Sequence, residues 1–573
     1  MERPWLQHYE PKVPKSLKIP DRTIPDLLAD AIVRYPKADA LVYFSRRLSF
    51  TDLGKMVERF AAVLSQLGVR KGDRVAIILP NMPQYPIAHY AIMKLGAIAV
   101  PTNPLYVERE LEHQLSDSGA KVAVALDLIC KRLEAVRPHT ALEQVIYASV
   151  PDYMPLVLRA LYPIKAKRAG KWVKAPRSAN THGFKDLMQR DFPPPPAIAI
   201  SPDDLAIFLY TGGTTGVSKG AVLTHRNLVA NVLQICSWIG EVNYGRETIL
   251  AALPFFHSYG MTTCLHLSVY IGSRNILLPR FDIHLVLKWI QKYRVSMFPG
   301  VPTMYVAVNN SPLTPKYNLK AVKVCLSGGA PLPLEVAKTF AKITGGASLV
   351  EGYGLSEASP VTHCNPLFSP SREGAIGLPV PETDAAVVDP ENRHPLPPGA
   401  VGELAVRGPQ VMQGYWRMEQ ETRQVLHDGW LLTGDMARMD KDGYFYIVDR
   451  KKDMIISGGL NIYPREVEEV LFSHPKIQEA AVIGTIDPYR GEVVKAFVVL
   501  KENVKATEEE IIAYCRERLA PYKVPKLLEF RPELPKSLIG KVLRRVLAEE
   551  EKRQRVATGT GVPVAEIAEK EAQ

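Results

Sequence analysis

The order of apolar and polar positions divides the chain into short strands that alternate with helices. From Leu53 to Leu67 the apolar side chains recur at helical spacing, which predicts an amphipathic helix. After it, Val75 to Leu79 predicts a buried strand, Gln84 to Leu95 a helix, and Ala97 to Val100 the next strand. This order is a βαβ unit, whose two strands run parallel because the helix returns the chain to the same end of the sheet.

The same alternation resumes after Pro193 to Pro196, which we expect to form a stiff, extended connector. A sheet of parallel strands with helices on both faces follows from such a pattern, so the fold class is α/β. The expected elements are strands at Leu205 to Tyr210, Thr248 to Leu253, Asn275 to Leu278 and Val295 to Phe298, and helices that begin near Thr224 and after a cap at Asp282.

The pattern changes twice in the second half of the chain. Ile376 to about Val448 contains short strands with Pro and Gly turns, which indicates a β-rich subdomain without a long helix. Beyond Asp453 the pattern predicts a small α+β domain with helices at Pro464 to Phe472, Glu508 to Leu519 and from Gly540, and strands at Ala480 to Ile483 and Val494 to Leu500. We therefore expect a large N-terminal domain (1–451, with the β-rich subdomain at about 376–448), a small C-terminal domain (452–555) and a flexible tail (556–573).

Composition narrows the class of protein. The 573 residues are 46% hydrophobic and 23% charged, which is typical of a globular enzyme and excludes a disordered or collagen-like chain. The six cysteines are scattered without zinc spacing, so we expect buried free thiols. The sequence lacks a secretory signal and an uninterrupted apolar span, so we expect a cytoplasmic protein.

The strongest local signal for chemistry is a glycine- and hydroxyl-rich segment, Thr211 to Gly220, directly after an apolar strand. Glycines allow backbone N–H groups to converge on an anion, and Lys219 adds a positive charge, so the segment predicts a phosphate site. Its spacing differs from that of a Walker-type loop, which disfavours that class of NTPase. The alternative interpretation is an ordinary flexible surface loop.

Two further glycine loops follow strands. Ser327 to Ala330 follows one, and Glu351 to Glu357 follows Ser348 to Val350. Loops at the carboxyl ends of strands in an open α/β sheet line one crevice, so we expect the three loops to face a common ligand. In that crevice Tyr353 could stack on a base and Glu357 could hold Mg²⁺, although a single glutamate is more often a solvated surface acid.

Taken together, the motifs resemble those of the AMP-forming acyl-CoA synthetases, within the adenylate-forming superfamily, and are most similar to bacterial long-chain fatty-acid CoA ligases. The resemblance extends to about Arg555 and is carried by Thr211 to Gly220, Pro254-Phe-Phe-His257, Gly352 to Glu357, Thr433-Gly-Asp435, Asp449 to Asp453 with Ser457-Gly-Gly459, and Leu534 to Lys541. It implies that ATP and a fatty acid give acyl-AMP and pyrophosphate, and that CoA then takes the acyl group. A mobile C-terminal domain would serve both steps.

The resemblance also implies roles for individual residues. For catalysis it implies Lys541, His257, Glu357 as the Mg²⁺ ligand, and Thr214; for the hinge between the domains it implies Lys452, and for the CoA channel Gly458 and Gly459. For ATP and AMP it implies Thr211, Gly212, Gly213, Thr215, Gly216, Lys219, Gly328, Gly329, Ala330, Tyr353, Gly354, Ser356, Asp435, Ile447 and Arg450. Without their motifs, His257 would be taken for an ordinary packed or surface histidine, and Lys541 for a solvated lysine.

Two positions depart from the family pattern. Ser356 stands where many relatives have threonine, and the hydroxyl is retained. Met261 lies where some long-chain relatives have a tryptophan proposed as the gate of the acyl tunnel, so the control of chain length is open.

The net charge is +11, and one basic cluster stands out between Arg159 and Arg177, interleaved with Leu158, Leu161 and Trp172. It predicts peripheral contact with an anionic membrane; the alternative is a solvated insertion with no partner. A nucleic-acid adaptor is disfavoured because no readout motif accompanies the charge. The runner-up function is a ligase for an aryl or shorter acid, or one that loads a carrier protein. The sequence leaves the oligomeric state open, with a homodimer as one candidate.

Overall fold

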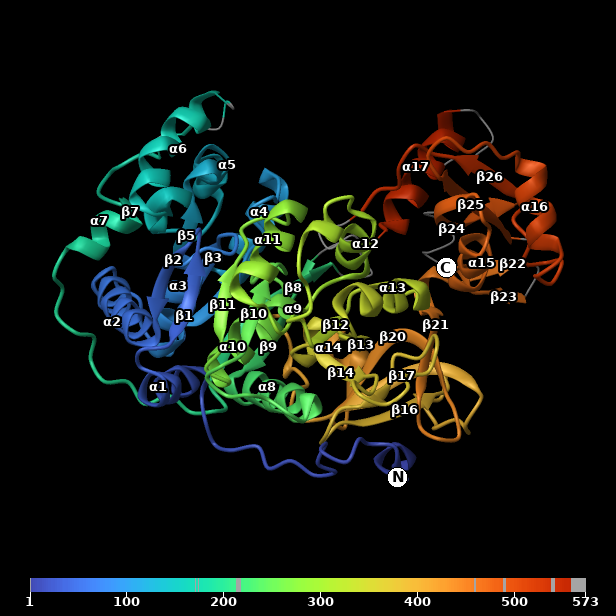
Figure 1. The fold of residues 1–573 in the computed structure, drawn as a ribbon, viewed down its shortest axis with the longest axis horizontal. Coiled ribbons are helices and arrows are strands. Elements are labelled where there is room, and N and C mark those ends of the chain that lie inside the picture. Colours follow the sequence, from blue (N-terminus) through green and yellow to red (C-terminus); the bar gives the residue numbers. More distant parts are fainter. Residues whose placement is uncertain are drawn as a thin grey trace. The chain divides into compact units, whose positions relative to one another are not determined.

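The computed structural model describes residues 2–168, 170, 172–173, 175–212, 218–457, 460–487, 491–536 and 542–557, with only the backbone described at residues 212, 450, 452, 460, 461 and 555–557. It contains two compact units (Figure 1). Unit 1 comprises residues 1–385, 405–432 and 441–444, and unit 2 comprises residues 386–404, 433–440 and 445–573. The chain passes between them within β16 (Asp384–Val388), β17 (Val401–Arg407) and β20 (Trp430–Met439).

Unit 1 is built around an eight-stranded sheet in the order β18-β9-β8-β4-β3-β5-β6-β7. The strands from β8 to β7 pair in parallel, whereas β8, β9 and β18 pair antiparallel. The predicted βαβ unit is β3-α3-β4, so that prediction is confirmed. The bounds are β3 (Arg74–Ile78), β4 (Ile98–Pro101), β5 (Val122–Leu126), β6 (Gln144–Ala148), β7 (Thr181–Gly183), β8 (Leu205–Gly212), β9 (Ser218–Thr224) and β18 (Gly414–Tyr415).

Helices cover this sheet, and side-chain caps fix where several of them begin. The side chains of Thr23, Ser49 and Thr224 accept backbone N–H groups of the first turns of α1, α2 and α8, and each such cap stabilises its helix by about 1 kcal/mol. The bounds are α1 (Ile24–Arg34), α2 (Phe50–Gln66), α3 (Gln84–Lys94), α4 (Glu108–Ser118), α5 (Cys130–Val136), α6 (Leu156–Arg168), α7 (Phe184–Gln189) and α8 (His225–Ile239).

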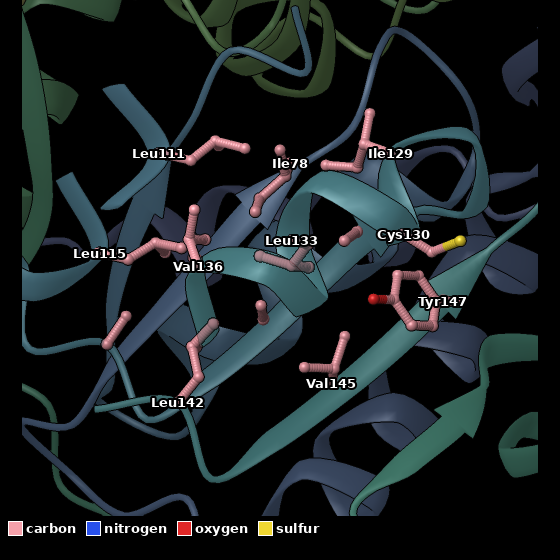
Figure 2. Close-up of a cluster of buried hydrophobic side chains, with 14 residues drawn as sticks. Ile78, Leu111, Leu115, Ile129, Cys130, Leu133, Val136, Leu142, Val145 and Tyr147 are labelled. Atoms are coloured by element: carbon pink, nitrogen blue, oxygen red, sulfur yellow. The ribbon is translucent and has the colours of Figure 1, made fainter. Parts of the chain in front are cut away.

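Figure 2 shows one of the cores that hold helices to this sheet. Leu133 and Val136 of α5 pack with Leu115 of α4 and with Ile78 and Val145 on the strands below. All five are at most 3% exposed, and burying a side chain of this size stabilises the fold by about 1.5–3 kcal/mol. The alternation of the sequence therefore places apolar faces on both layers.

A second sheet of unit 1 has the order β10-β11-β1-β2, and a third has the order β12-β13-β14-β15. The prediction of a strand at Val295 to Phe298 is wrong, because Met297 makes only isolated bridges to Ile249 and Val324 and no continuous ladder forms. Pro299 follows directly and cannot donate to a ladder. The bounds are β1 (Asp39–Tyr43), β2 (Arg46–Ser49), β10 (Thr248–Ala251), β11 (Arg274–Leu277), β12 (Val324–Ser327), β13 (Ser348–Gly354), β14 (Val361–Cys364) and β15 (Leu378–Pro379).

The helical segments of this half of unit 1 begin with an irregular stretch after β10. It comprises α9 (Ser258–Gly260), the π-helical turn η5 (Met261–His266) and α10 (Leu267–Tyr270). The cap predicted at Asp282 is confirmed, since its side chain accepts the N–H of Leu285 at 3.0 Å. The remaining helices are α11 (Ile283–Tyr293), α12 (Pro302–Asn310), α13 (Leu334–Thr344) and α14 (Glu419–Val425), the last being the seven-residue helix of the β-rich region, where β19 (Leu426–His427) follows it.

Unit 2 contains a sheet in the order β23-β22-β25-β24, with β26 paired to β25. Its core joins Val467 and Leu471 of α15 with Val482, Ala496 and Ile511. The helix predicted at Pro464 to Phe472 is confirmed at both ends. The bounds are β21 (Phe445–Arg450), η8 (Lys451–Asp453), β22 (Ile455–Ser457), β23 (Leu460–Ile462), α15 (Pro464–Phe472), β24 (Ile477–Asp487), β25 (Gly491–Leu500), α16 (Glu508–Arg516), β26 (Leu527–Phe530) and α17 (Arg544–Ala557).

Several remaining expectations have clear outcomes. All six cysteines are buried free thiols, as predicted. Residues 191–200, around the proline connector, form neither helix nor strand. In the part of the chain that the structure describes, no helix has the length and apolarity needed to cross a membrane. The predicted tail, apart from the last residues of α17, lies outside the described residues.

Candidate active site

The glycine- and threonine-rich segment connects two antiparallel strands. Thr211 at the end of β8 lies opposite Lys219 of β9, and the Ser218 hydroxyl donates to the Thr211 carbonyl at 2.9 Å. These contacts fix both ends of the segment. Its central residues, which include the predicted phosphate ligands Gly213, Thr214, Thr215 and Gly216, lie outside the described residues.

Glu357 lies beside this hairpin. Its Oε1 atom accepts hydrogen bonds from the Tyr415 hydroxyl at 2.9 Å and from the Thr211 hydroxyl at 3.3 Å. Tyr415 belongs to β18, which pairs with β9, and the Lys219 ammonium lies 5.4 Å from the centre of its ring. Burial and the nearby Glu357 carboxylate raise the pKa of Tyr415, so its phenol stays a neutral donor. The carboxylate predicted to hold Mg²⁺ is thus tied to the predicted phosphate segment.

Glu357 also has the chemistry that a magnesium ion requires. Mg²⁺ prefers oxygen ligands and binds through one or two carboxylates together with substrate phosphates and water. Among the described residues, no group of three or more His, Cys, Asp or Glu side chains is arranged to hold a metal ion. A single carboxylate next to the predicted phosphate segment fits Mg²⁺ that is carried in with a nucleotide.

The loop predicted to surround adenine follows β12. A Cβ on Gly328 would lie 3.1 Å from the Tyr259 ring, so a side chain fits only if that ring shifts. Gly329 has a φ of +80°, which favours glycine. Glu351 closes the loop by accepting the backbone N–H of Leu332 at 2.8 Å. Ala330 follows Gly329 in this turn, so the three predicted residues form one tight segment.

The third glycine segment is a strand over part of its length, which corrects the prediction that a loop begins at Glu351. β13 continues through Gly354 because, beyond its parallel partner β12, the antiparallel strand β14 pairs with it and sets Tyr353 opposite His363. A Cβ on Gly354 would lie 2.0 Å from the Pro360 carbonyl oxygen. The turn that carries Ser356 and Glu357 therefore begins only at Leu355.

His257 is held close to the same turn. It caps the short helix α9, and its Nδ1 accepts the backbone N–H of Tyr259 at 3.3 Å. The next residue, Ser258, places its hydroxyl oxygen 3.0 Å from that of Ser356. Tyr259 in turn donates to the Leu326 carbonyl at 2.5 Å, one strand position before the adenine loop. The segments of His257, Glu357 and Gly328 are thus joined by direct hydrogen bonds.

An apolar cavity of about 40 Å³ lies behind these segments in unit 1. Its wall comes from α8, β10, η5, α10, β12 and β14, and includes Trp238, Thr263, Leu326, Leu367 and Val380. Leu326 also accepts the Tyr259 hydrogen bond, so the cavity and the polar site share a wall. Met261 is fully buried at the start of η5.

The remaining predicted residues belong to unit 2. In the β20–β21 pair Asp435 lies opposite Arg450, and Ala437 lies opposite Ile447. The backbone of Lys452 is in the turn η8. The predicted residues Gly458, Gly459 and Lys541 lie outside the described residues.

Sequence reasoning missed Tyr415 and Tyr259. Tyr415 contacts Glu357 across 58 residues of sequence and stands in no glycine loop or charged motif. Tyr259 follows the recognised Pro254-Phe-Phe-His257 motif by two residues, so its proximity to that motif was the only available signal.

Comparison with known proteins identifies the family of the chain. The family model described as "AMP-binding enzyme" matches residues 28–416, and "AMP-binding enzyme C-terminal domain" matches residues 466–541. A long-chain-fatty-acid–CoA ligase of Bacillus subtilis (strain 168) is 47% identical over 552 residues, covering 96% of this chain and 98% of the relative. A protein of the same name from Escherichia coli O6:H1 is 40% identical over 560 residues, with the same shares of the two chains covered.

The fold is also that of solved adenylate-forming enzymes. The crystal structure of ATP-bound MatB from Rhodopseudomonas palustris superposes with a TM-score of 0.81 at 29% identity, covering 92% of this chain and 99% of that one. These matches confirm the resemblance drawn from the motifs and the α/β fold class with its smaller C-terminal part. The chain belongs to the AMP-binding enzyme family, among its acyl-CoA synthetases.

Proposed function

We propose that this protein is a long-chain fatty-acid CoA ligase. It joins a fatty carboxylate to the α-phosphate of ATP, releases pyrophosphate, and transfers the acyl group from acyl-AMP to CoA. The relative that is 47% identical along nearly the whole chain carries this name. The runner-up, a ligase for an aryl or shorter acid or for a carrier protein, is retained as an outcome of the test.

The observation that carries the proposal is the position of Glu357 between Thr211 and Tyr415, beside a hairpin rich in glycine. The adjoining Tyr259 bonds to Leu326, which lines the apolar cavity. A carboxylate that attacks a phosphate brings two anions together, so the barrier falls only where positive charge and donors are already in place. Bound Mg²⁺ would neutralise charge on the phosphates, and Lys219 and the backbone N–H groups of the hairpin would bind the pyrophosphate.

The other residues have distinct proposed roles in this reaction. Gly328, Gly329, Ala330 and Tyr353 would surround adenine, with Gly354 and Ser356 in the adjoining turn, while Asp435 and Arg450, near Ile447, would hold the ribose. His257 would lie where the carboxylate meets the α-phosphate, and Lys541 would bridge the two. The hinge at Lys452 would then exchange Lys541 for Gly458 and Gly459, which would line the channel for CoA.

The apolar cavity is the proposed binding site for the start of the acyl chain. Transfer of a hydrocarbon chain from water into such a cavity is favourable by about 0.8 kcal/mol of free energy per methylene group. Met261 is fully buried at the start of the turn that also supplies Thr263 to the wall, so its flexible side chain would be the gate.

Purified protein tests the proposal with ATP, Mg²⁺, CoA and a panel of acids from acetate to oleate plus one aryl acid. We expect pyrophosphate release that depends on a long-chain acid, followed by loss of the free CoA thiol. Release driven only by the aryl or short acid, or release without thiol loss until a carrier protein is added, would support the runner-up. Absence of AMP with every acid would contradict both.

We also propose that the protein is cytoplasmic and that α6 attaches it to the inner face of an anionic membrane. Val157, Leu161 and Ile164 recur at helical spacing and are 71%, 54% and 54% exposed. Lys165 and Arg168 on the same helix are exposed as well, whereas Lys171 and Lys174 lie outside the described residues. The apolar side chains would insert into the membrane, and each cation would contribute about 1 kcal/mol of binding free energy near anionic headgroups. The protein would then lie close to the membrane that supplies its fatty-acid substrate.

Vesicle flotation tests this attachment. The protein should float with vesicles that contain phosphatidylglycerol, should float less with phosphatidylcholine alone, and should lose binding when Leu161 and Ile164 are replaced by serine. Val33→Ser is the matched control, because Val33 is 81% exposed on another helix, α1. Equal flotation of the wild type and the double variant would contradict the role of α6. Light scattering of the purified protein without vesicles distinguishes a monomer from the homodimer.

A further inference from the structure

The apolar cavity is closed on one side by residues that the N-terminal segment holds in place. This segment, residues 2–22, contains only the short helical turn Pro4–Gln7 and otherwise runs as irregular chain up to α1, drawn in blue in Figure 1. Two consecutive residues in it, Tyr9 and Glu10, contact the parts of unit 1 that form the cavity wall.

The first wall residue is Trp238 on α8. The Tyr9 ring packs edge-on against the Trp238 ring, with the ring centres 5.2 Å apart and an angle of 85° between the planes. The Trp238 indole donates to the Asn365 carbonyl at 3.0 Å, and only 3% of Trp238 is exposed. Trp238 thus lines the cavity on one side and is covered by Tyr9.

The second and third wall residues are Leu367 and Val380. The Glu10 carboxylate accepts the backbone N–H groups of Leu367 at 3.3 Å, Phe368 at 2.7 Å and Ser369 at 2.6 Å. The Tyr9 hydroxyl donates to the carbonyl of Pro379, directly before Val380, at 2.6 Å. Burial raises the pKa of Tyr9, which keeps this hydroxyl protonated as a donor.

The cavity of about 40 Å³ has room for only a few groups the size of water, so a long hydrocarbon chain enters only as far as the walls yield. Interiors are packed closely enough that such a wall moves only if what lies behind it moves too. Tyr9 and Glu10 contact Trp238, Leu367 and the residue before Val380, and neither lines the cavity itself. Loosening these two contacts should therefore change how much chain the cavity accepts.

We propose that the N-terminal segment supports the wall of the acyl cavity and that Tyr9 and Glu10, acting through Trp238, Leu367 and Val380, set the length of acyl chain the enzyme accepts. The inference rests on the proposed fatty-acid ligase function. Tyr9 and Glu10 are positioning residues, since neither lines the cavity.

The test compares kcat/KM for octanoate, laurate, palmitate and octadecanoate in the wild type and four variants. Tyr9→Ala and Trp238→Ala remove the two rings, Tyr9→Phe removes only the hydroxyl, and Lys15→Ala is the control because Lys15 is exposed on the same segment. We expect the ratio of octadecanoate to laurate to rise about tenfold in Trp238→Ala and about threefold in Tyr9→Ala, the order of change produced by one methylene-sized space. Tyr9→Phe should shift the ratio less than Tyr9→Ala, and Lys15→Ala should leave it unchanged.

A merely structural role would lower activity with all four acids by the same factor and leave their ratio constant, and that result would overturn the inference. The KM for ATP is measured alongside and should stay constant if only the cavity changes. If Trp238→Ala fails to fold, Tyr9→Ala still provides the test, because Tyr9 is partly exposed and its replacement disturbs the core less. If the wild type used none of the four acids, the proposed function itself would fail, which is a different outcome from an unchanged ratio.

Discussion

Glu357 is the residue on which the proposed adenylation step most depends. Its carboxylate is oriented by two neutral hydroxyl donors, Tyr415 at 2.9 Å and Thr211 at 3.3 Å, so its negative charge is held in place without being neutralised. A neutral amide would keep the shape of the side chain but would lose most of its attraction for Mg²⁺.

We therefore expect Glu357→Gln to slow pyrophosphate release at least about a hundredfold and to raise the Mg²⁺ concentration needed for half-maximal rate. Tyr415→Phe, which removes one hydrogen bond to a charged group, should slow pyrophosphate release about tenfold. Glu335→Gln, on the exposed start of α13, is the matched control. Pyrophosphate release by Glu357→Gln at the wild-type rate would exclude this carboxylate from the metal site.

Buried histidines give a second effect at the scale of single residues, this time on stability. His89 and His266 are fully buried with their Nε2 atoms 2.8 Å apart, an arrangement in which one neutral ring donates to the other. Burial lowers the pKa of His89 to about 3 and that of His225 to about 4. In the unfolded chain these rings take up a proton at about pH 6.5, so protons favour the unfolded state below that pH.

The free energy of unfolding should therefore be highest above about pH 6.5 and should fall on acidification, by up to about 1.4 kcal/mol per pH unit for each such histidine. This loss extends down to about pH 4 for His225 and about pH 3 for His89. Urea unfolding at pH 7.5 and pH 5 measures it. In His89→Gln the free energy of unfolding should depend less on pH than in the wild type. The control is His394→Gln at an exposed position, where the dependence should equal that of the wild type. Identical slopes in all three proteins would show that His89 is not the cause.

At the scale of elements, the sequence predicted those helix ends that are determined by nearby side chains. The cap at Asp282 and both ends of the helix Pro464–Phe472 follow from side chains within one or two turns. The strand expected at Val295 to Phe298 failed because its apolar run is followed by Pro299, and the run alone does not reveal how many ladder bonds can form. The partner strand that extends β13 to Gly354 was equally hidden, since β14 lies later in the chain.

The start of α17 shows how one element can depend on charges from several others. Arg544 binds Asp449 at 3.0 Å, Asp453 at 3.2 Å and Glu468 at 2.5 Å, and Glu468 also accepts the Val482 N–H at 2.9 Å. These acids lie on β21, η8 and α15, on both sides of the proposed hinge at Lys452. Arg544 therefore holds the hinge segment against α17 within unit 2.

Replacing Arg544 by alanine should destabilise unit 2 by about 3–5 kcal/mol, because removing one partner leaves buried carboxylates without compensation. The double variant Arg544→Ala with Glu468→Gln should regain part of this loss, since one of those charges is gone. Differential scanning calorimetry of the full chain measures both. The control is Arg545→Ala, because Arg545 is the exposed neighbour of Arg544. A double variant no more stable than Arg544→Ala would contradict the argument from buried charge.

At the scale of the whole molecule, the sequence identified the segments of the site better than their contacts. The loops at Thr211, Gly328 and Glu357 each have a local signal in glycine and hydroxyl residues, and the structure joins their neighbours through Ser258, Tyr259 and Tyr415. The contacts themselves link residues from about 70 to 150 positions apart in several cases, such as Thr211 with Glu357, and no local pattern encodes such a pairing. For the same reason the packing of Tyr9 on Trp238 was not foreseen.

The whole chain must carry out two half-reactions with different chemical needs, and the proposed hinge at Lys452 separates them. Lys541→Ala should abolish formation of acyl-AMP, because the positive charge that draws the carboxylate to the α-phosphate is lost. It should leave thioester formation from supplied acyl-AMP and CoA largely intact, since in that step the carboxylate is already activated as a mixed anhydride and a thiol attacks its carbonyl. Gly459→Leu, which would obstruct the channel for CoA, should show the opposite pattern. Rapid-quench measurement of each half-reaction separates them, and an equal loss in both steps for either variant would rule out alternation about the hinge.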